Sequence, residues 1–283
     1  MMKTAFIVYC SPAGSTRHVA KVVAASLKEK PIDIHQLDLG IVRDPSRFVD
    51  KIQAAGEKAC LFVGSPVYRD MAVPPVMAFI DNLPIADGVP AVPFVTWGGA
   101  LSGVALWEMG RALQGKGYAI VGAAKVLAVH SMMWLSDHPV GEGHPDAEDD
   151  RQVAELVDRV VERLSQATVD RLPVDALDYQ PEARSTDIKK KLGQPWMIIP
   201  KTIDEDKCTQ CAICKQICPV SAVTLDPWPG FDQNCFDCFN CIRECPEEAI
   251  VPAVSMDQIE TTIRGRVETF NEQPPTQIFF KHF

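Results

Sequence analysis

The sequence lacks the signatures of several large protein classes. No segment holds about 18 consecutive apolar residues, so we expect no membrane span. Neither a Walker A loop nor the G-x-G-x-x-G fingerprint is present, which excludes the two commonest glycine-rich nucleotide loops. Positive charge is scarce: 28 basic residues stand against 37 acidic ones, and the net charge of −9 argues against binding nucleic acid or an anionic membrane.

The composition is that of a folded protein. Apolar residues make up 47% and charged residues 23% of the 283 positions, which is ordinary for a chain that buries a core. The length suggests roughly two domains. An apolar run from Ala5 to Cys10 is too short for a signal peptide.

Cysteine is concentrated in one stretch. Eight of the ten cysteines form two copies of C-x-x-C-x-x-C-x-x-x-C-P between residues 208 and 246. The copies hold Cys208, Cys211, Cys214 and Cys218, then Cys235, Cys238, Cys241 and Cys245. Thiolates at i, i+3 and i+6 can cap three corners of an iron–sulfur cube. A disulfide framework or two zinc sites are the alternatives, but zinc ribbons lack the third cysteine and the Cys-Pro.

This repeat resembles the bacterial two-cluster ferredoxin over about residues 197–253. In that arrangement the fourth cysteine of each copy ligates the other cluster. The resemblance therefore implies one [4Fe–4S] cluster on Cys208, Cys211, Cys214 and Cys245, and another on Cys235, Cys238, Cys241 and Cys218. Clusters held by thiolates need reducing surroundings, so we expect a cytoplasmic protein.

The N-terminus reads as a strand, a small polar loop and a helix. Thr4 to Cys10 is a continuous run of strand formers, and Arg17 to Lys28 has helical apolar spacing. Between them lies the loop of Ser11, Pro12, Ala13, Gly14, Ser15 and Thr16. Gly14 lets the backbone approach an anion, and the loop precedes the positive end of a helix. This order predicts a phosphate site.

Four more strands are expected downstream, at Ile32 to Leu37, Ala59 to Val63, Ala91 to Val95 and Ala119 to Val129. Helices should separate them, over Phe48 to Ala55, from near Pro74, and over Val104 to Leu113. Strands alternating with helices require right-handed crossovers and a parallel sheet that binds ligands beyond the carboxyl ends of its strands.

These loops resemble the flavodoxin family over about residues 1–168. Ser11, Gly14 and Thr16 match the S/T-x-x-G-x-T loop with which flavodoxins hold the FMN phosphate, although Ser15 replaces the usual Asn. Two further loops lie where flavodoxins hold the isoalloxazine: Ser65, Pro66, Val67, Tyr68 and Arg69, then Thr96, Trp97, Gly98 and Gly99. Tyr68 and Trp97 are the stacking candidates, with core packing as the alternative. An empty pocket is the competing interpretation of the site.

The loop after the fifth strand, residues 130–150, is rich in histidine and glycine. His130, His138 and His144 suggest a metal site, but we favour a loop that covers the flavin or docks on the cysteine-rich segment. Gly141, Gly143 and Pro145 resemble the Gly-x-Gly-x-Pro loop of the flavodoxin–ferredoxin fusion proteins of anaerobes.

The sequence thus predicts an α/β protein with a flavodoxin-like five-stranded doubly wound parallel sheet and a second small α+β ferredoxin-like domain. The expected divisions are 1–168 for the FMN domain, 169–196 for a linker, 197–253 for two [4Fe–4S] clusters, and 254–283 for a helix and a docking tail. A capping box at Ser255 and Gln258 should start that helix. The tail should dock on the first domain or on a second subunit, as in a homodimer.

The favoured function is electron transfer between FMN and the clusters, which would couple two-electron and one-electron partners. A redox partner protein would dock on the acidic cysteine-rich segment. No catalytic Ser/His/Asp set stands out. The alternatives are a flavin reductase acting on a small acceptor or NAD(P)H, and a cluster-binding module without flavin.

Overall fold

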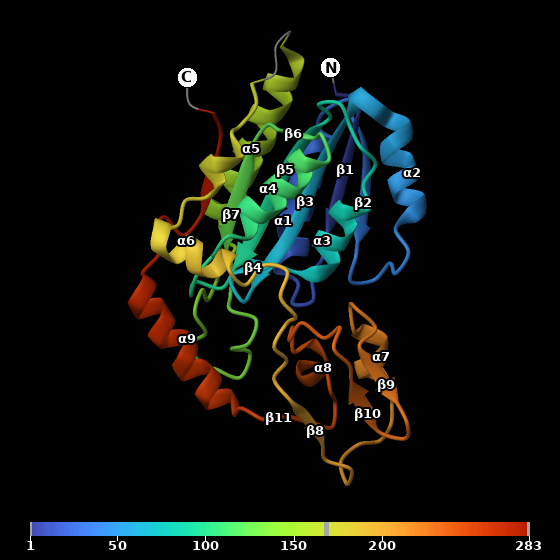
Figure 1. Ribbon diagram of the computed structural model, residues 1–283, viewed down its shortest axis with the longest axis vertical. Coiled ribbons are helices and arrows are strands. Elements are labelled where there is room, and N and C mark those ends of the chain that lie inside the picture. The colour runs from blue at the N-terminus through green and yellow to red at the C-terminus, as the bar shows by residue number, and fades with distance from the viewer. Residues whose placement is uncertain (1, 167–169, 282–283) are drawn as a thin grey trace.

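The computed structural model describes residues 2–166 and 170–281. Figure 1 shows an α/β part above and the small cysteine-rich part below it, with the linker and the C-terminal segments along one side. No helix in these two ranges combines the length and apolarity needed to cross a bilayer.

The α/β part is built on a parallel sheet. Its five long strands are β1 (Thr4–Tyr9), β2 (Asp33–Asp38), β3 (Ala59–Tyr68), β5 (Pro90–Trp97) and β7 (Ala123–Leu127). They lie side by side as β2-β1-β3-β5-β7, all parallel. This is the flavodoxin-like strand order, so the expected fold class is confirmed.

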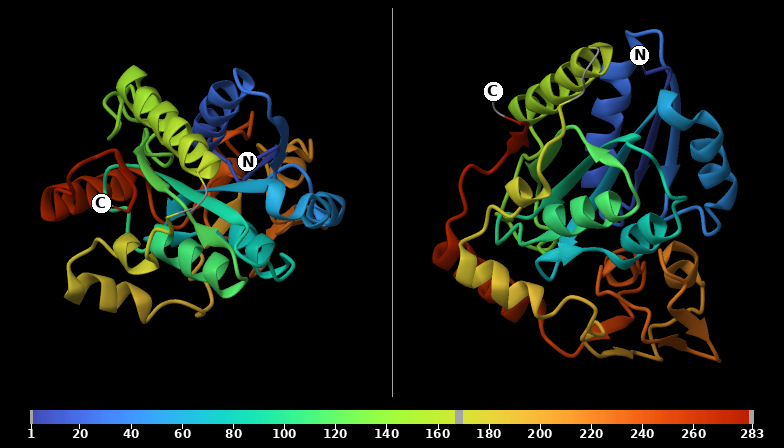
Figure 2. Two further views of the ribbon diagram at one scale, coloured as in Figure 1. Left: turned by 90° about the horizontal axis from the view of Figure 1, so that it is seen from above. Right: turned by 45° about the horizontal axis from the view of Figure 1, so that its top comes forward.

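Helices cover both faces, as Figure 2 shows from above. On one face lie α1 (Ser15–Lys28) and α5 (Ala147–Ser165). On the other lie α2 (Ser46–Ala55), α3 (Pro74–Asp81) and α4 (Ala105–Gly115). Alternate residues of β1 enter the two cores: Ala5 and Ile7 face α1, while Phe6 and Val8 face the opposite side. The inner strands β1, β3, β5 and β7 are mainly apolar because both of their faces are covered, whereas the edge strand β2 is largely polar.

The expected fifth strand, Ala119 to Val129, is wrong in its extent. The structure has a short β6 (Ala119–Ile120) and a separate β7, because the chain breaks at Val121 and Gly122. A Cβ at Gly122 would lie 2.9 Å from the ring of Phe280. The break therefore lies where the C-terminal tail packs.

The C-terminal tail adds an antiparallel strand to the sheet. Helix α9 (Met256–Phe270) begins at the expected capping box of Ser255 and Gln258. After it, β12 (Gln277–Phe279) pairs with β7. The tail thus docks on the flavodoxin-like part of its own chain.

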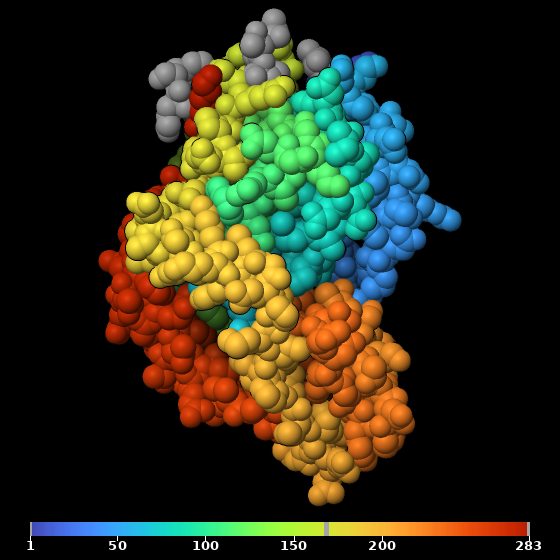
Figure 3. All heavy atoms as spheres, viewed as in Figure 1, coloured from blue at the N-terminus to red at the C-terminus, as the bar shows by residue number. Residues whose placement is uncertain are grey.

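The expected linker is partly helical. It contains the short helix η2 (Val174–Leu177) and α6 (Glu182–Lys189). Figure 3 shows this yellow segment beside the red C-terminal segment. The guanidinium of Arg184 on α6 stacks over the ring of Phe270 on α9, 4.4 Å from its centroid. The two segments therefore pack together over one side of the sheet.

The cysteine-rich part is a duplicated unit of two short sheets and two short helices. Antiparallel pairs join β8 (Lys201–Ile203) to β11 (Ile250–Pro252) and β9 (Val223–Leu225) to β10 (Pro229–Phe231), and the helices are α7 (Ile213–Ile217) and α8 (Asn240–Arg243). A two-residue hairpin strand, β4 (Met71–Ala72), completes the α/β part.

Left-handed backbone marks the duplication. Six non-glycine residues with positive φ fall into three pairs, each 27 residues apart: Gln210 and Asp237, Ala212 and Phe239, Ser221 and Glu248. The cysteines repeat with the same interval. Because L-residues rarely adopt this conformation, its recurrence shows that the two copies follow the same backbone course.

Candidate redox-cofactor sites

The structure separates the eight cysteines into two sets. Cys208, Cys211, Cys214 and Cys245 line one small cavity and form what we call the outer set. The inner set is Cys218, Cys235, Cys238 and Cys241; burial, and then the charges of the other three thiols, raise the pKa of Cys241, so the four lie close together. In each set the fourth member comes from the other sequence copy, which is the crossed arrangement expected from the pattern.

The spacing of the thiols fits a cluster better than a single ion. Among the described residues, one group of three or more potential metal ligands has its ligand atoms within 4.8 Å of one another, and that group contains no cysteine. The thiols of neither cysteine set therefore come this close together in threes. Four thiolates around one zinc ion at about 2.3 Å would lie about 3.8 Å apart. The cysteine sets are therefore too open for zinc but suit a larger iron–sulfur cube.

The surroundings of the thiols also suit such a cube. The amide of Ala222 donates to Cys218 Sγ at 3.3 Å, and the amide of Ala249 donates to Cys245 Sγ at 3.4 Å. Burial raises the pKa of Cys238 to about 12. Buried thiols of this kind are deprotonated only when a bound cation compensates their charge. Amide donors to sulfur are one of the means by which proteins set cluster potentials.

A buried charged group lies beside the inner set. The side chain of Lys201 is 1% exposed, and its Nζ lies 3.7 Å from Cys235 Sγ. Lys201 donates to Asp237 Oδ1 at 2.7 Å. The same carboxylate accepts from Arg69 of the β3–β4 turn at 3.1 Å. Asp237 thus joins a cluster-side cation to a loop of the α/β part.

A second site lies at the carboxyl ends of the parallel strands, next to the start of α1. We call it the loop pocket; its volume is about 120 Å³. Gly14 precedes α1 with φ +97° and, as a glycine, offers no side-chain cap, and the first turn of the helix holds no acidic residue. Ser11 Oγ accepts from the amide of Arg17 at 2.9 Å, which holds the loop against the helix. Uncapped amides at a helix start suit an anion.

Ten of the thirteen expected flavin-site residues line the loop pocket: Ser11, Ala13, Ser15, Thr16, Pro66, Val67, Tyr68, Thr96, Trp97 and Gly98. Gly14, Ser65 and Gly99 do not line it. Ser65 is fully buried and its Oγ accepts from the amide of Val73, so it supports the β3 loop from behind. The hydroxyls of Thr16 and Thr96 share a hydrogen bond of 2.8 Å, which joins the first loop to the third.

A third wall comes from residues 128–132, of which 130–132 belong to the loop expected to cover the flavin or to dock on the cysteine-rich segment, although none was named as a flavin-site residue. Ala128, Val129, His130, Ser131 and Met132 line the loop pocket. The hydroxyl of Ser131 shares a 3.0 Å hydrogen bond with that of Tyr68. Burial, and then the charge of Arg266, lowers the pKa of the partly buried His130 to about 4, so this imidazole is neutral at pH 7. The position of these residues after the fifth parallel strand was the signal that could have found them.

The two aromatic stacking candidates are both packed. Tyr68 is 8% exposed, and its ring meets Phe236 edge-on at 5.8 Å. Trp97 is 3% exposed, and its indole N–H donates to the carbonyl of Pro275 at 2.8 Å. The indole is thereby held under the C-terminal tail, whereas the Tyr68 phenol remains bonded across the pocket.

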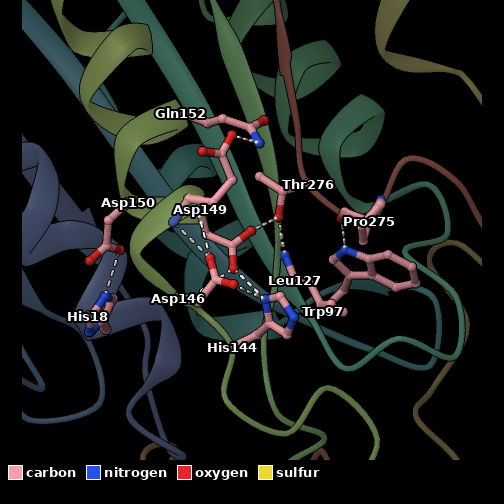
Figure 4. Close-up of polar contacts among 11 residues, drawn as sticks. His18, Trp97, Leu127, His144, Asp146, Asp149, Asp150, Gln152, Pro275 and Thr276 are labelled. Carbon is pink, nitrogen blue, oxygen red and sulfur yellow. Dashed lines mark hydrogen bonds and ion pairs between the residues drawn. The ribbon is translucent and has the colours of Figure 1, made fainter.

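The histidine-rich loop forms a structural network around Asp149, drawn in Figure 4. Asp149 is 4% exposed and accepts from the amide of Asp146 and from Thr276 Oγ1; it also lies 2.6 Å from His144 Nδ1. Thr276 in turn accepts from the amide of Leu127 at 2.9 Å. His144, Asp146 and Asp149 are the one ligand-like group noted above. Both Asp149 oxygens are engaged, so the network fixes the tail to α5 and β7.

The inner set adjoins the loop pocket. The thiol of Cys238 is close enough to Tyr68 and Cys10 to raise their pKa values, although burial is the larger cause for both. Cys238 also packs against the core that contains these two residues. On α8, Arg243 donates to the carbonyl of Pro12 at 2.8 Å. In contrast, Cys211 of the outer set is exposed.

Known proteins match the cysteine-rich part. The family model described as "4Fe-4S binding domain" matches residues 201–224. The delta subunit of the NADH-dependent phenylglyoxylate dehydrogenase of Aromatoleum evansii is 34% identical over 65 residues, which are 22% of this chain and 70% of that protein. The PorD subunit of pyruvate synthase from Methanocaldococcus jannaschii is 32% identical over 80 residues, which are 27% of this chain and 88% of that protein. This chain belongs to the 4Fe–4S ferredoxin family.

Ferredoxin-type domains carry electrons on their clusters, so the chain is an iron–sulfur electron-transfer protein whose ferredoxin domain is joined to a flavodoxin-like fold. Among solved structures, an archaeal flavodoxin is 19% identical with a TM-score of 0.44, covering 58% of this chain and 99% of its own. The rubredoxin:oxygen oxidoreductase of Desulfovibrio gigas is 20% identical with a TM-score of 0.44, and the match covers 57% of this chain and 36% of the oxidoreductase chain.

Proposed function

We propose that this chain is an electron-transfer flavoprotein that binds FMN in the loop pocket and a [4Fe–4S] cluster on each cysteine set. FMN can take up two electrons and release them singly, whereas each cluster carries one. The chain would therefore couple a two-electron partner to a one-electron partner. We assign residues 1–168 to the flavin domain, 169–196 to the linker, 197–253 to the clusters, and 254–283 to the C-terminal helix and tail.

One observation carries this proposal: the inner set borders the loop pocket, while the outer set reaches the surface. Cys238 packs against the core beneath Tyr68, and Arg243 bonds the first loop directly. Cys211 is exposed. An electron entering at the outer cluster would pass to the inner cluster and then to the flavin without leaving the protein.

The chain's own residues would hold the flavin and exclude water from it. The uncapped start of α1 and the hydroxyls of Ser15 and Thr16 would bind the phosphate. Arg243, fixed against Pro12, adds positive charge beside this loop. Tyr68 and Ser131 close the pocket between the second loop and residues 128–132.

The surface of the ferredoxin domain favours a basic partner. Between residues 200 and 252 there are nine acidic and four basic residues, which gives a net charge of −5 before any cluster charge is added. Complementary charge mainly speeds encounter and orients the partner. We propose that a redox protein docks there, at the exposed Cys211 end.

An anaerobic redox titration with iron and flavin quantified tests the proposal. We expect about eight irons and one FMN per chain. With a one-electron donor protein as the reductant, flavin reduction should slow as salt rises, because salt screens the acidic surface. Zinc in place of iron would contradict the cluster assignment, and iron without flavin would leave only a cluster-binding module. Rapid flavin reduction by NAD(P)H alone would favour a reductase.

A further inference from the structure

A second, larger cavity lies where three parts of the chain meet. We call it the junction cavity; its volume is about 370 Å³, within the range of sites for small organic molecules. Figure 1 shows α9, the loop after β7 and the cysteine-rich part converging below the sheet. Its walls come from the second and third loops, from ferredoxin-domain residues such as Ile199 and Phe236, and from α9.

The junction cavity is continuous with the loop pocket. The two share Val67, Tyr68, Arg69, Gly98, His130 and Met132 as lining residues. A molecule in the junction cavity would therefore lie against whatever group the loop pocket holds. Neither the phosphate loop nor the cluster cysteines line it, so it extends from the isoalloxazine loops of the loop pocket towards α9 and the ferredoxin domain.

The charged groups of this cavity neutralise one another. Arg69 pairs with Asp237, and Arg266 pairs with Asp70. His130 has its pKa lowered to about 4 by burial and by Arg266, and it adds no charge at pH 7. The lining residues thus carry two positive and two negative charges, and the buried Lys201, which shares Asp237 with Arg69, lies outside the lining beside Cys235. A dinucleotide or a free carboxylate would find no unpaired cation, and burying an unpaired charge is costly.

The rest of the lining is apolar. Ala100, Leu101, Met132, Ile199, Phe236, Val254, Ile259 and Ile263 line the cavity. Ile259 and Ile263 are the buried residues of α9, and both face this space. Helix α9 is anchored by two contacts to other parts of the chain: Arg266 forms an ion pair with Asp70, and Arg264 donates to the carbonyl of His138. Arg264 also forms an ion pair with Glu260 within the helix. An apolar wall is therefore held in place beside a redox site.

We propose that the junction cavity binds an uncharged, mainly apolar electron acceptor, of which a quinone is the simplest class. The quinone would accept two electrons and two protons and leave as the hydroquinone; a fully reduced, neutral flavin in the loop pocket would supply both electrons and both protons and return to its oxidised form. This electron source rests on the proposed function, but binding of the acceptor does not.

Binding of the neutral naphthoquinone menadione to the purified chain tests the site directly. Ile263→Trp fills the cavity from the α9 side, and Thr261→Trp, on the exposed face of the same helix, is the matched control. We expect Ile263→Trp to weaken menadione binding by about tenfold or more while iron and FMN contents stay unchanged, and Thr261→Trp to have no effect. If Ile263→Trp fails to fold, Thr262→Trp at the cavity edge takes its place.

Two outcomes would overturn the proposal. Unchanged menadione affinity in the filled variant would show that the quinone binds elsewhere or not at all. Loss of FMN with retention of iron would show that the cavity holds the flavin ring itself. Because binding is measured separately from flavin content, a chain that lacks FMN but binds menadione here would refute the proposed function and leave the cavity assignment intact.

The charge balance can be tested independently. Asp70→Asn removes the partner of Arg266, and Asn tolerates the left-handed conformation of this residue (φ 68°). We expect a sulfonated naphthoquinone to bind the wild-type chain about tenfold more weakly than menadione, and the variant to reduce that difference. Equal affinity of both quinones for the wild-type chain would refute the neutrality argument.

Discussion

Lys201 is a buried cation beside the inner cysteine set, and replacing it with methionine should lower the reduction potential of the cluster held there. Its Nζ lies 3.7 Å from Cys235 Sγ, and its side chain is 1% exposed. Reduction adds a negative charge to the cluster, and a nearby buried cation stabilises that charge. Methionine keeps most of the volume and removes the cation.

The size of the effect follows from the distance. A full charge at 3.7 Å in an effective dielectric of about 20 is worth about 4 kcal/mol, an upper bound. The added electron is shared over the whole cluster, so we expect about 1–2 kcal/mol, which is about 40–90 mV for a one-electron couple. Asp237→Asn should raise the potential by a similar amount, because Asp237 Oδ1 lies 3.9 Å from the same sulfur.

A potentiometric titration followed by electron paramagnetic resonance measures both shifts. The outer cluster is the internal control, since its potential should stay nearly constant in both variants. Lys207→Met is the matched surface control: its side chain is 55% exposed, so solvent and salt screen its charge. Shifts of the same sign in Lys201→Met and Asp237→Asn, or equal shifts of both clusters, would refute the reasoning.

Three further predictions concern the flavin domain. Gly14→Val should abolish FMN binding and retain iron. Gly56→Val is the matched control and should keep both, because Gly56 also has a positive φ and an added Cβ would meet no neighbour at either position. Full FMN content in Gly14→Val would refute the phosphate placement. Lys125→Met should cost about 3–5 kcal/mol in chemical denaturation, because it leaves Glu272 buried without its ion-pair partner; a loss below 1 kcal/mol would contradict this. Acidification from pH 6.5 towards 4 should destabilise the chain by about 1–3 kcal/mol, because the folded-state pKa of His130 lies below its unfolded value and the folded state resists protonation. His130→Gln should flatten this pH dependence in melting curves recorded across the range. A pH profile unchanged by His130→Gln would contradict the prediction.

Glu272, in the C-terminal tail, also makes stability depend on pH, but burial opposes the lowering of its pKa, whereas burial is the main cause of the lowering at His130. Burial alone would raise the pKa of Glu272, but the charge of Lys125 and the hydrogen bonds from Ser102 outweigh it and lower the pKa. Its stabilising contribution is therefore complete above the unfolded pKa of about 4.3 and is lost only as pH falls through the lower folded value. This places the contribution of Glu272 at more acidic pH than that of His130.

Local pattern was sufficient for much of the fold. The strands, the start of α3 near Pro74 and the capping box at Ser255 were predictable, because each depends on residues a few positions apart. Pattern failed at Gly122, where the strand breaks against Phe280, and at the indole of Trp97, which bonds Pro275. Those contacts join residues more than 150 positions apart, and no periodicity reports them.

By itself, the sequence determined the two cysteine patterns and the parallel α/β sheet, since ligand spacing and right-handed crossovers are local rules. Only the tertiary structure decided that the inner set faces the loop pocket, that Lys201 lies beside Cys235, and that α9 encloses a cavity without net charge. These depend on how two folded parts and a C-terminal segment pack together. That packing is the sum of many weak contacts between distant residues, which no short stretch of sequence encodes.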